Sequence, residues 1–382
     1  MEKRLDTLLE YLEQHIDETH IRNTEQLYLD AVAYREIDHI PLATIFVPEN
    51  AEPFPYAEAF EDPEKMLYNE LVRSAHGTST LASVIAKDEF LPQIRSNHGI
   101  GILASLFGAN CKIVYNSMPW VEPISEEQIK KVIAHGVPDF HQALGQKVYD
   151  FIAYFHQRLS AYPKCARNIR ITQPDLQGPF DIAHLLIGSD IFYWVYDEPE
   201  MLKDLLQLAT DTYIGYIKTI FPIVNDQMGE NAMYLHGSVC TGRALVKDDC
   251  AIQNLSKEMY FEFAKFYNEQ ILEQLQGASI HFCGKENPWQ CEAIDSPWLR
   301  GVNYGNPELQ NLDTLWNYWS PKKIPNFMWG DAVRQVRYPN FDYSKQLRDK
   351  GIRTGMTLTL HVNDADEAKR ILEQHIENSH KA

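Results

Sequence analysis

The sequence is poor in cysteine and in long apolar runs, and each shortage excludes a class of protein. Six cysteines in 382 residues are too few for a disulfide framework, so we expect reduced thiols that serve as core residues or as ligands. No run approaches the roughly 18 consecutive apolar residues of a membrane helix. The first 20 residues are charged and amphipathic, without the apolar core of a signal peptide. We therefore expect a cytoplasmic protein that contacts no membrane.

Positive charge is also scarce. The chain carries 35 Lys and Arg against 53 Asp and Glu, a formal net charge of −18. Phosphate backbones and anionic lipids bind clustered Lys and Arg, so we expect no nucleic-acid partner. A Gly-rich phosphate-binding loop is missing as well, because the stretch 98–103 is too incomplete to count. Polyanions are therefore not expected as partners, and we expect a small-molecule substrate.

Short apolar or alternating runs recur along the chain, separated by stretches with helical patterns. Two of these helical stretches begin with a capping residue, Asp62 before Pro63 and Ser256. This rhythm predicts parallel strands with helical crossovers and, from eight units, a (β/α)8 TIM barrel in residues 39–382 behind an N-terminal helical extension over residues 1–38. An open doubly wound sheet is the alternative. The predicted strands are 40–47, 83–94, 168–173, 232–238, 278–283, 301–304, 325–329 and 355–362.

Polar residues follow most of these predicted strands. Active sites of barrels lie at the carboxyl ends of the strands, so this distribution favours an enzyme site there. Asp88, in contrast, reads as a surface charge. The strand-end residues are Arg95, Asn97, Gln173, Asp175, His236, Ser238, His281, Cys283, Asn303, Tyr304, Trp329, Asp331 and His361.

His281 and Cys283 are the clearest candidates for a metal site. They stand two apart on a predicted strand, so both side chains point to the same face, opposite Ile280 and Phe282. Imidazole nitrogen and thiolate sulfur are preferred ligands of Zn²⁺. His361 shares a face with Thr357 and Thr359 on the last strand and is our predicted third ligand, which leaves one coordination position open. Cys291 competes with His361 for that place.

Several segments resemble the uroporphyrinogen decarboxylase superfamily, and within it the zinc-dependent branch that includes methylcobamide:coenzyme M methyltransferases. The similarity runs from about Asp38 onward. Its most specific element is Ile280-His281-Phe282-Cys283-Gly284. Further similar segments are Asp38-His39-Ile40-Pro41, Gly178 to Ala183, and Asp248 to Ala251 followed by Ser256 and by Tyr260 to Phe266.

The resemblance implies a TIM barrel that binds zinc through His-x-Cys and a later cysteine, where this sequence has His361. It also implies, as methyl donor or acceptor, a corrinoid carried on a separate small protein, and it allows a homodimer. The decarboxylase branch places an Arg-rich motif after the first strand. Here residues 46–53 are acidic and contain no arginine, which disfavours a substrate with many carboxylates.

We therefore predict a zinc-dependent methyltransferase or demethylase that moves a methyl group between a small substrate and a corrinoid or thiol. Asp248 and His236 are predicted to act in catalysis. The predicted substrate-binding residues are Asn97, Gln173, Tyr304, Trp329 and Asp331. Two other classes stay open: a metal-free lyase that acts on a carboxylated small molecule, and a non-catalytic barrel that binds a small ligand.

Overall fold

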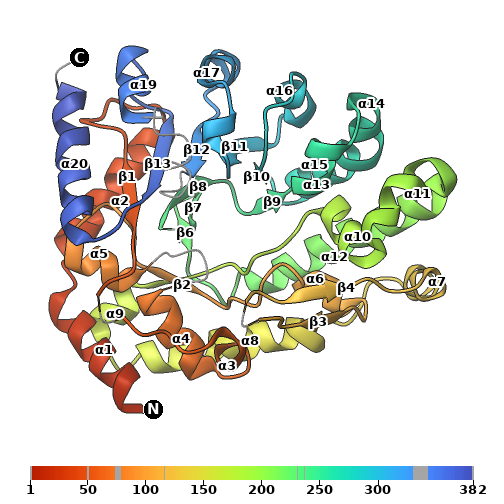
Figure 1. Cartoon of the computed structure of the whole chain (residues 1–382), viewed down its shortest axis with the longest axis horizontal. Coiled ribbons are helices and arrows are strands. Elements are labelled where there is room, and N and C mark those ends of the chain that lie inside the picture. The colour runs from red at the N-terminus through yellow and green to blue at the C-terminus, as the bar shows by residue number, and fades with distance from the viewer. Residues whose placement is uncertain are drawn as a thin grey trace.

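The structure is a computed structural model that describes residues 2–49, 51–73, 79–115, 117–229, 231–235, 237–329 and 343–380. It is an α/β fold in which helices surround parallel strands (Figure 1). The strands are β1 (Leu42–Ile45), β2 (Gln93–Arg95), β3 (Asn110–Lys112), β4 (Trp120–Glu122), β5 (Arg170–Thr172), β6 (Gln227–Met228), β7 (Ala232–Leu235), β8 (Ser238–Thr241), β9 (Leu245–Lys247), β10 (Ala278–Phe282), β11 (Leu299–Tyr304), β12 (Asn326–Trp329) and β13 (Met356–His361).

The α-helices follow most strands and lie outside them. The predicted caps at Asp62 and Ser256 are confirmed, because their side chains accept backbone N–H bonds from the first turns of α4 and α14. The helices are α1 (Glu2–His15), α2 (Glu18–Val32), α3 (Tyr56–Ala59), α4 (Pro63–Val72), α5 (Thr80–Ala86), α6 (Ile102–Leu106), α7 (Glu126–His135), α8 (Ala143–Leu159), α9 (Pro163–Asn168), α10 (Pro179–Ile187), α11 (Ile191–Asp197), α12 (Pro199–Ile220), α13 (Asp249–Asn254), α14 (Lys257–Tyr260), α15 (Phe266–Gln274), α16 (Gln290–Ile294), α17 (Leu312–Trp319), α19 (Tyr343–Asp349) and α20 (Ala365–His380).

A six-stranded parallel sheet holds the candidate site. Its order is β1-β13-β12-β11-β10-β9. The outward side chains, such as Ile280 and Leu358, are apolar and pack in the main core, as the sequence predicts. The inward side chains, such as Ser279 and Thr357, are polar yet buried. Both faces are therefore covered, and these strands alternate between apolar outward residues and polar inward residues.

The strands β2 and β5 form a second parallel pair, and the segment after β5 approaches β9, one of the two edge strands of the large sheet. A single bridge between Gln177 and Lys247 links the segment after β5 to β9. Among the described residues no ladder joins β2 to β1. The N–H groups of Leu42 and Thr44 are bound instead by the carboxylates of Glu89 (2.7 Å) and Asp88 (3.1 Å). Asp88 is thus a buried partner of the β1 edge and not the predicted surface charge.

The antiparallel strands β6, β7 and β8 form a small sheet in the centre of the molecule (Figure 1). Hydrogen bonds join β8 to the inner face of the large sheet: the Ser279 hydroxyl donates to the Thr241 carbonyl at 2.7 Å, and Ser238 bonds to Thr357 at 3.3 Å. The prediction of a fourth parallel strand over 232–238 is therefore wrong in part, because residues 232–235 form β7, which is antiparallel to both its neighbours. Its alternating pattern belongs to the antiparallel hairpin of β7 and β8. The parallel strand next to β10 is β9.

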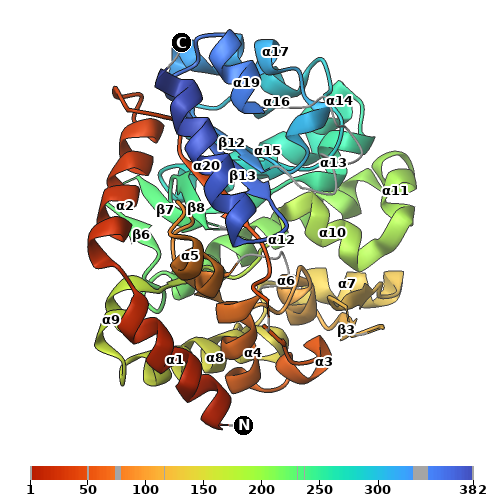
Figure 2. The ribbon, with the colours of Figure 1, turned by 60° about the vertical axis from the view of Figure 1, so that its left-hand side comes forward.

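The prediction of one strand over 83–94 is also wrong in part, because α5 occupies residues 80–86 and only Gln93–Arg95 forms β2. The first 38 residues carry α1 and α2, and α2 packs against β13 and β8. At the other end of the chain, α20 packs against α5, α19 and β1 (Figure 2). In the part of the chain that the structure describes, no helix has the length and apolar character needed to cross a membrane.

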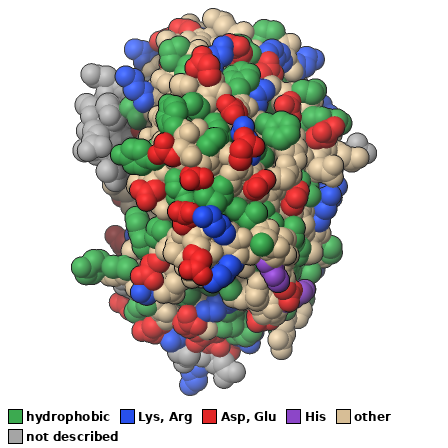
Figure 3. Space-filling model, turned by 90° about the vertical axis from the view of Figure 1, so that its right-hand side faces the viewer, with side chains coloured by type: hydrophobic (Ala, Val, Ile, Leu, Met, Phe, Trp, Pro, Cys, Tyr) green, Lys and Arg blue, Asp and Glu red, His purple; other side chains and the backbone are tan. Residues whose placement is uncertain are grey.

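The side of the molecule that carries α7, α11 and α14 shows apolar, acidic and basic side chains interspersed (Figure 3). Tyr193 and Tyr196 of α11 are exposed to 68% and 69%. No large basic field is visible on this face, in agreement with the net charge of −18.

Candidate metal centre

His281 and Cys283 converge as the strand pattern predicts. His281 lies near the end of β10, and Cys283 directly follows this strand. Both side chains therefore lie on the face of the sheet that Ser279 shares, where β8 packs. The distance from His281 Nε2 to Cys283 Sγ is 3.5 Å. His281 is 3% exposed, whereas Cys283 is half-buried. The pair is thus placed at the boundary between the packed interior and more open space.

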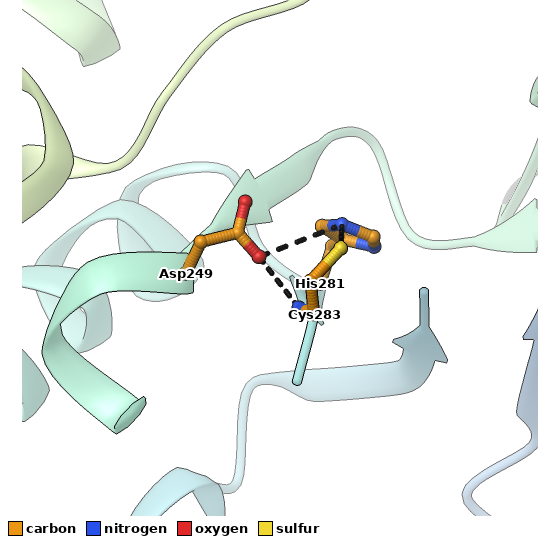
Figure 4. Close-up of side chains that lie close together, drawn as sticks. All are labelled: Asp249, His281 and Cys283. Atoms are coloured by element: carbon orange, nitrogen blue, oxygen red, sulfur yellow. Dashed lines mark hydrogen bonds and ion pairs between the residues drawn. The ribbon is translucent and has the colours of Figure 1, made fainter. Parts of the chain in front are cut away.

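Asp249 completes a cluster with these two residues (Figure 4). Its carboxylate Oδ1 lies 3.7 Å from His281 Nε2 and accepts the backbone N–H of Cys283 at 2.5 Å. The three ligand atoms lie within 4.8 Å of one another. Oxygen, nitrogen and sulfur from three separate side chains therefore face one point, and this donor set is suited to a metal ion of the zinc type.

The local backbone explains why Asp249 reaches this point. Asp249 is the first residue of α13, and only Asp248 separates this helix from the end of β9. The N–H of Asp248 donates to the His281 carbonyl at 2.9 Å and extends the contact between β9 and β10. The carboxylate of Asp181 accepts the N–H groups of Asp249 and Cys250, both at 2.8 Å. The first bond holds the start of α13 against the end of β10, and the other two hold it against α10.

Asn303 fixes the orientation of the His281 ring. Its side-chain amide donates to the Phe327 carbonyl at 3.0 Å, so its oxygen faces His281 Nδ1 at 2.5 Å. His281 Nδ1 therefore carries the ring proton, and the lone pair of Nε2 points toward Cys283 and Asp249. Burial lowers the pKa of His281, an effect that the nearby carboxylate of Asp249 opposes. Burial thus favours the neutral imidazole that metal ligation requires.

The absence of a side chain at Gly305 leaves room for the Cys283 thiol. A Cβ atom at this position would lie 2.4 Å from Cys283 Sγ and 3.1 Å from His281 Cε1. Any larger residue would displace the thiol, so the site depends on the close approach of this backbone.

The two residues considered for the third ligand lie elsewhere. His361 ends β13, separated from β10 by β11 and β12, and its nitrogens are not among the atoms of the cluster. Cys291 lies buried in α16, where burial raises the pKa of its thiol to about 12. In the described part of the chain, the third close ligand atom comes from Asp249. The role of His361 stays a prediction.

Asp248 points away from the cluster. Its buried carboxylate accepts bonds from Tyr260 (2.5 Å) and Asn268 (2.9 Å), which belong to the helices outside β9. Burial raises the pKa of Asp248 to about 7, while these two bonds act in the opposite direction. The other predicted catalytic residue, His236, lies outside the described residues.

The predicted substrate-binding residues fall into three groups. Asn97 and Gln173 lie near the ends of β2 and β5: Asn97 accepts a bond from Arg95 at 3.3 Å, and Gln173 lines a cavity. Tyr304 is fully buried, and its hydroxyl accepts a bond from the indole of Trp319. Trp329 ends β12, where its backbone pairs with Thr359, and Asp331 lies outside the described residues.

The sequence predictions give Asp249 no role in the site and name Asn303 only as a polar residue at a strand end. The signal for Asn303 was present, because it stands at a strand end in register with His281 on the adjacent strand. Asp249 is next to Asp248, the predicted catalytic residue, and a three-residue strand such as β9 is too short for its pattern to indicate which of the two faces inward.

Comparison with solved structures shows that this fold is similar to that of a methyltransferase from Methanosarcina mazei. The similarity covers 94% of this chain and 99% of that chain, with a TM-score of 0.57 and 12% sequence identity. No family model matches the chain. No curated protein matches it either. The chain therefore shares its fold with this methyltransferase across nearly its full length.

Proposed function

We propose that this protein is a zinc-dependent methyltransferase or demethylase of the uroporphyrinogen decarboxylase-like type, with the metal at Asp249, His281 and Cys283. The observation that carries the proposal is the convergence of three different ligand atoms within 4.8 Å. The shared fold with a methyltransferase supports the reaction class. In this proposal β1, β2, β5 and β9 to β13 correspond to the eight strands of a TIM barrel.

The residues present fit a zinc ion in their chemistry. His281 offers Nε2 because Nδ1 is bound to Asn303, Cys283 offers sulfur, and Asp249 offers a carboxylate oxygen. Three protein ligands leave a position open, which is the arrangement of catalytic zinc sites. Bound there, zinc would lower the pKa of a coordinated thiol and polarise a leaving heteroatom.

The chain's own residues would prepare and shield this chemistry. Asn303 holds the ring proton of His281 on Nδ1. Asp249 accepts the backbone N–H of Cys283 and also directs its carboxylate toward the proposed metal position. The substrate is a small molecule in this proposal, and the methyl donor or acceptor is a thiol or a corrinoid on a partner protein. A homodimer is compatible with it.

Metal analysis of purified variants tests the proposal. Wild type should hold close to one zinc per chain, and His281→Ala, Cys283→Ala and Asp249→Ala should each lose most of it. Cys291→Ala is the matched control, a buried cysteine outside the cluster, and should keep its zinc. Loss of zinc in His361→Ala would add this residue to the ligand set, and retention of zinc would contradict the prediction that His361 is a ligand.

Activity provides the second arm of the test. Methyl transfer from methylcobalamin to 2-mercaptoethanol should disappear on chelation and return with added zinc. Full methyl transfer in chelated protein would contradict the role of zinc, whereas no methyl transfer in zinc-loaded protein would favour the lyase class or a non-catalytic binding protein. Wild-type protein that never binds more than traces of zinc would overturn the proposal.

A further inference from the structure

Two buried cations and one carboxylate meet at the ends of three strands. Arg95 ends β2, Asp175 follows β5 and Lys247 ends β9. Lys247 Nζ lies 2.5 Å from Asp175 Oδ1, and Arg95 Nη1 lies 3.5 Å from Asp175 Oδ2. The three side chains are only 11%, 9% and 2% exposed, in the order Lys247, Arg95 and Asp175. The group is thus withdrawn from bulk water.

These residues line a cavity. The space between its lining atoms is about 410 Å³, part of it open to solvent. Gln173 adds a side-chain amide, while Tyr213 and Met233 supply apolar wall. The cavity therefore combines an apolar body with a few convergent polar groups.

The charges around the cavity are not balanced by the described residues that face it. One carboxylate serves both cations, and the Lys247 ammonium uses one of its three N–H donors on it among the described residues. Glu70 also lies near Arg95, but it accepts the Arg95 backbone N–H (3.2 Å) and the Asn97 amide (2.9 Å). Burial raises the pKa of Glu70, an effect that the nearby Arg95 charge and these two bonds oppose. A buried cation without a full partner is costly, so an anion is the ligand that this cavity favours.

The cavity adjoins the candidate metal centre. Lys247 and His281 are paired in register on neighbouring parallel strands. Their side chains share the inward face, since Leu245 and Lys247 both line the cavity while His281 bonds inward-facing Asn303. A molecule with one end at Lys247 would have its other end close to the metal ligands.

We propose that this cavity binds an oxyanion group of the substrate, a carboxylate or a phosphate, through Lys247 and Arg95. Lys247 donates to the anion with the N–H groups that Asp175 does not use, and Arg95 adds its guanidinium charge. Asn97 positions Arg95 without charge neutralisation. As a statement about the substrate, this inference rests on the proposed function, because it places the rest of the molecule at the metal centre.

Binding of acetate and of inorganic phosphate tests the inference directly. NMR line broadening of each ion is followed at constant ionic strength, with wild type and variants, so that the two probes separate carboxylate from phosphate. Lys247→Met should weaken binding of the preferred ion about tenfold or more, because it removes a charge-assisted bond. Lys285→Met, an exposed lysine just beyond β10, is the control and should bind within about twofold of wild type.

Asp175→Asn gives a result of opposite sign. Loss of the resident carboxylate leaves both cations available, so binding should become tighter by about tenfold. A purely structural ion cluster predicts no saturable binding in wild type and no gain in Asp175→Asn, and either of those results overturns the inference. The Asp175→Asn result does not depend on whether Lys247→Met folds.

The same titrations on chelated protein separate this inference from the proposed function. Saturable binding that persists in chelated protein supports the anion site, and the metal proposal is then overturned only if wild type never takes up zinc. A full zinc site without saturable binding of either ion overturns only the anion site.

Discussion

Replacement of Asn303 by alanine perturbs the metal centre without touching a ligand. The variant removes the acceptor at His281 Nδ1, and it leaves the Phe327 carbonyl without its amide partner. Asn303 is 5% exposed, so water does not readily replace these bonds. The free ring then populates both tautomers and several orientations, and only one of them directs the Nε2 lone pair to Cys283. A buried bond of this kind is worth about 1–3 kcal/mol, so we expect zinc affinity to fall by roughly tenfold to hundredfold.

Competition against a chromophoric chelator at fixed pH measures this affinity. Asn303→Asp is the matched control: it keeps an oxygen acceptor for His281 Nδ1 but loses the donor to Phe327. It should therefore lose thermal stability yet keep zinc affinity near that of wild type. Zinc affinity of Asn303→Ala within about twofold of wild type would refute the reasoning, and so would equal losses in both variants.

Three further predictions follow from the packing. Gly305→Ala places a methyl group against Cys283 Sγ and should weaken zinc binding about tenfold, with little change in circular dichroism; unchanged binding would contradict the close approach. Asp88→Ala leaves the Thr44 N–H without its partner and should lower the free energy of unfolding by about 2 kcal/mol or more in urea titrations, whereas a neutral result would show that water replaces the carboxylate. Burial raises the pKa of Asp226 from 3.8 to about 6, so the folded state holds this proton more tightly and wild type loses stability as the pH rises through that window. Relative to wild type, Asp226→Asn should gain up to about 3 kcal/mol between about pH 4 and about pH 7, and a stability difference that does not change with pH would refute the assignment.

The part of the site on β10 could be predicted because strand geometry alone determines it. Residues two apart share a face, so His281 and Cys283 had to converge once the strand was identified. The apolar residues between and beside them, Ile280 and Phe282, pack in the core as expected. Neither inference needs information about other parts of the chain.

Other parts depend on long-range contacts that no local pattern encodes. The hairpin of β7 and β8 shows the same alternation of apolar and polar residues as any other strand. Bonds such as that of Ser279 to Thr241 hold it against the inner face of the large sheet. The carboxylates of Asp88 and Glu89 accept the backbone N–H groups at the edge of β1. In the sequence, two adjacent acidic residues are more typical of an exposed turn. Periodicity could not reveal either arrangement.

Asp249 illustrates the same limit at the site itself. β9 has three residues, which is too short for a periodic signal to fix its end or the direction of the residues that follow it. The choice between Asp248 and Asp249 depends on Tyr260 and Asn268, which bind the former from outside the sheet. Only the packed structure separates the two carboxylates.

X-ray absorption spectroscopy of the zinc-loaded protein tests the central claim most directly. The account predicts a first shell with one sulfur at about 2.3 Å, from Cys283, and nitrogen or oxygen ligands at about 2.0–2.1 Å, from His281 and Asp249. The sulfur contribution should vanish in Cys283→Ser and remain in Cys291→Ser. Two sulfur ligands in wild type, or none, would contradict the account.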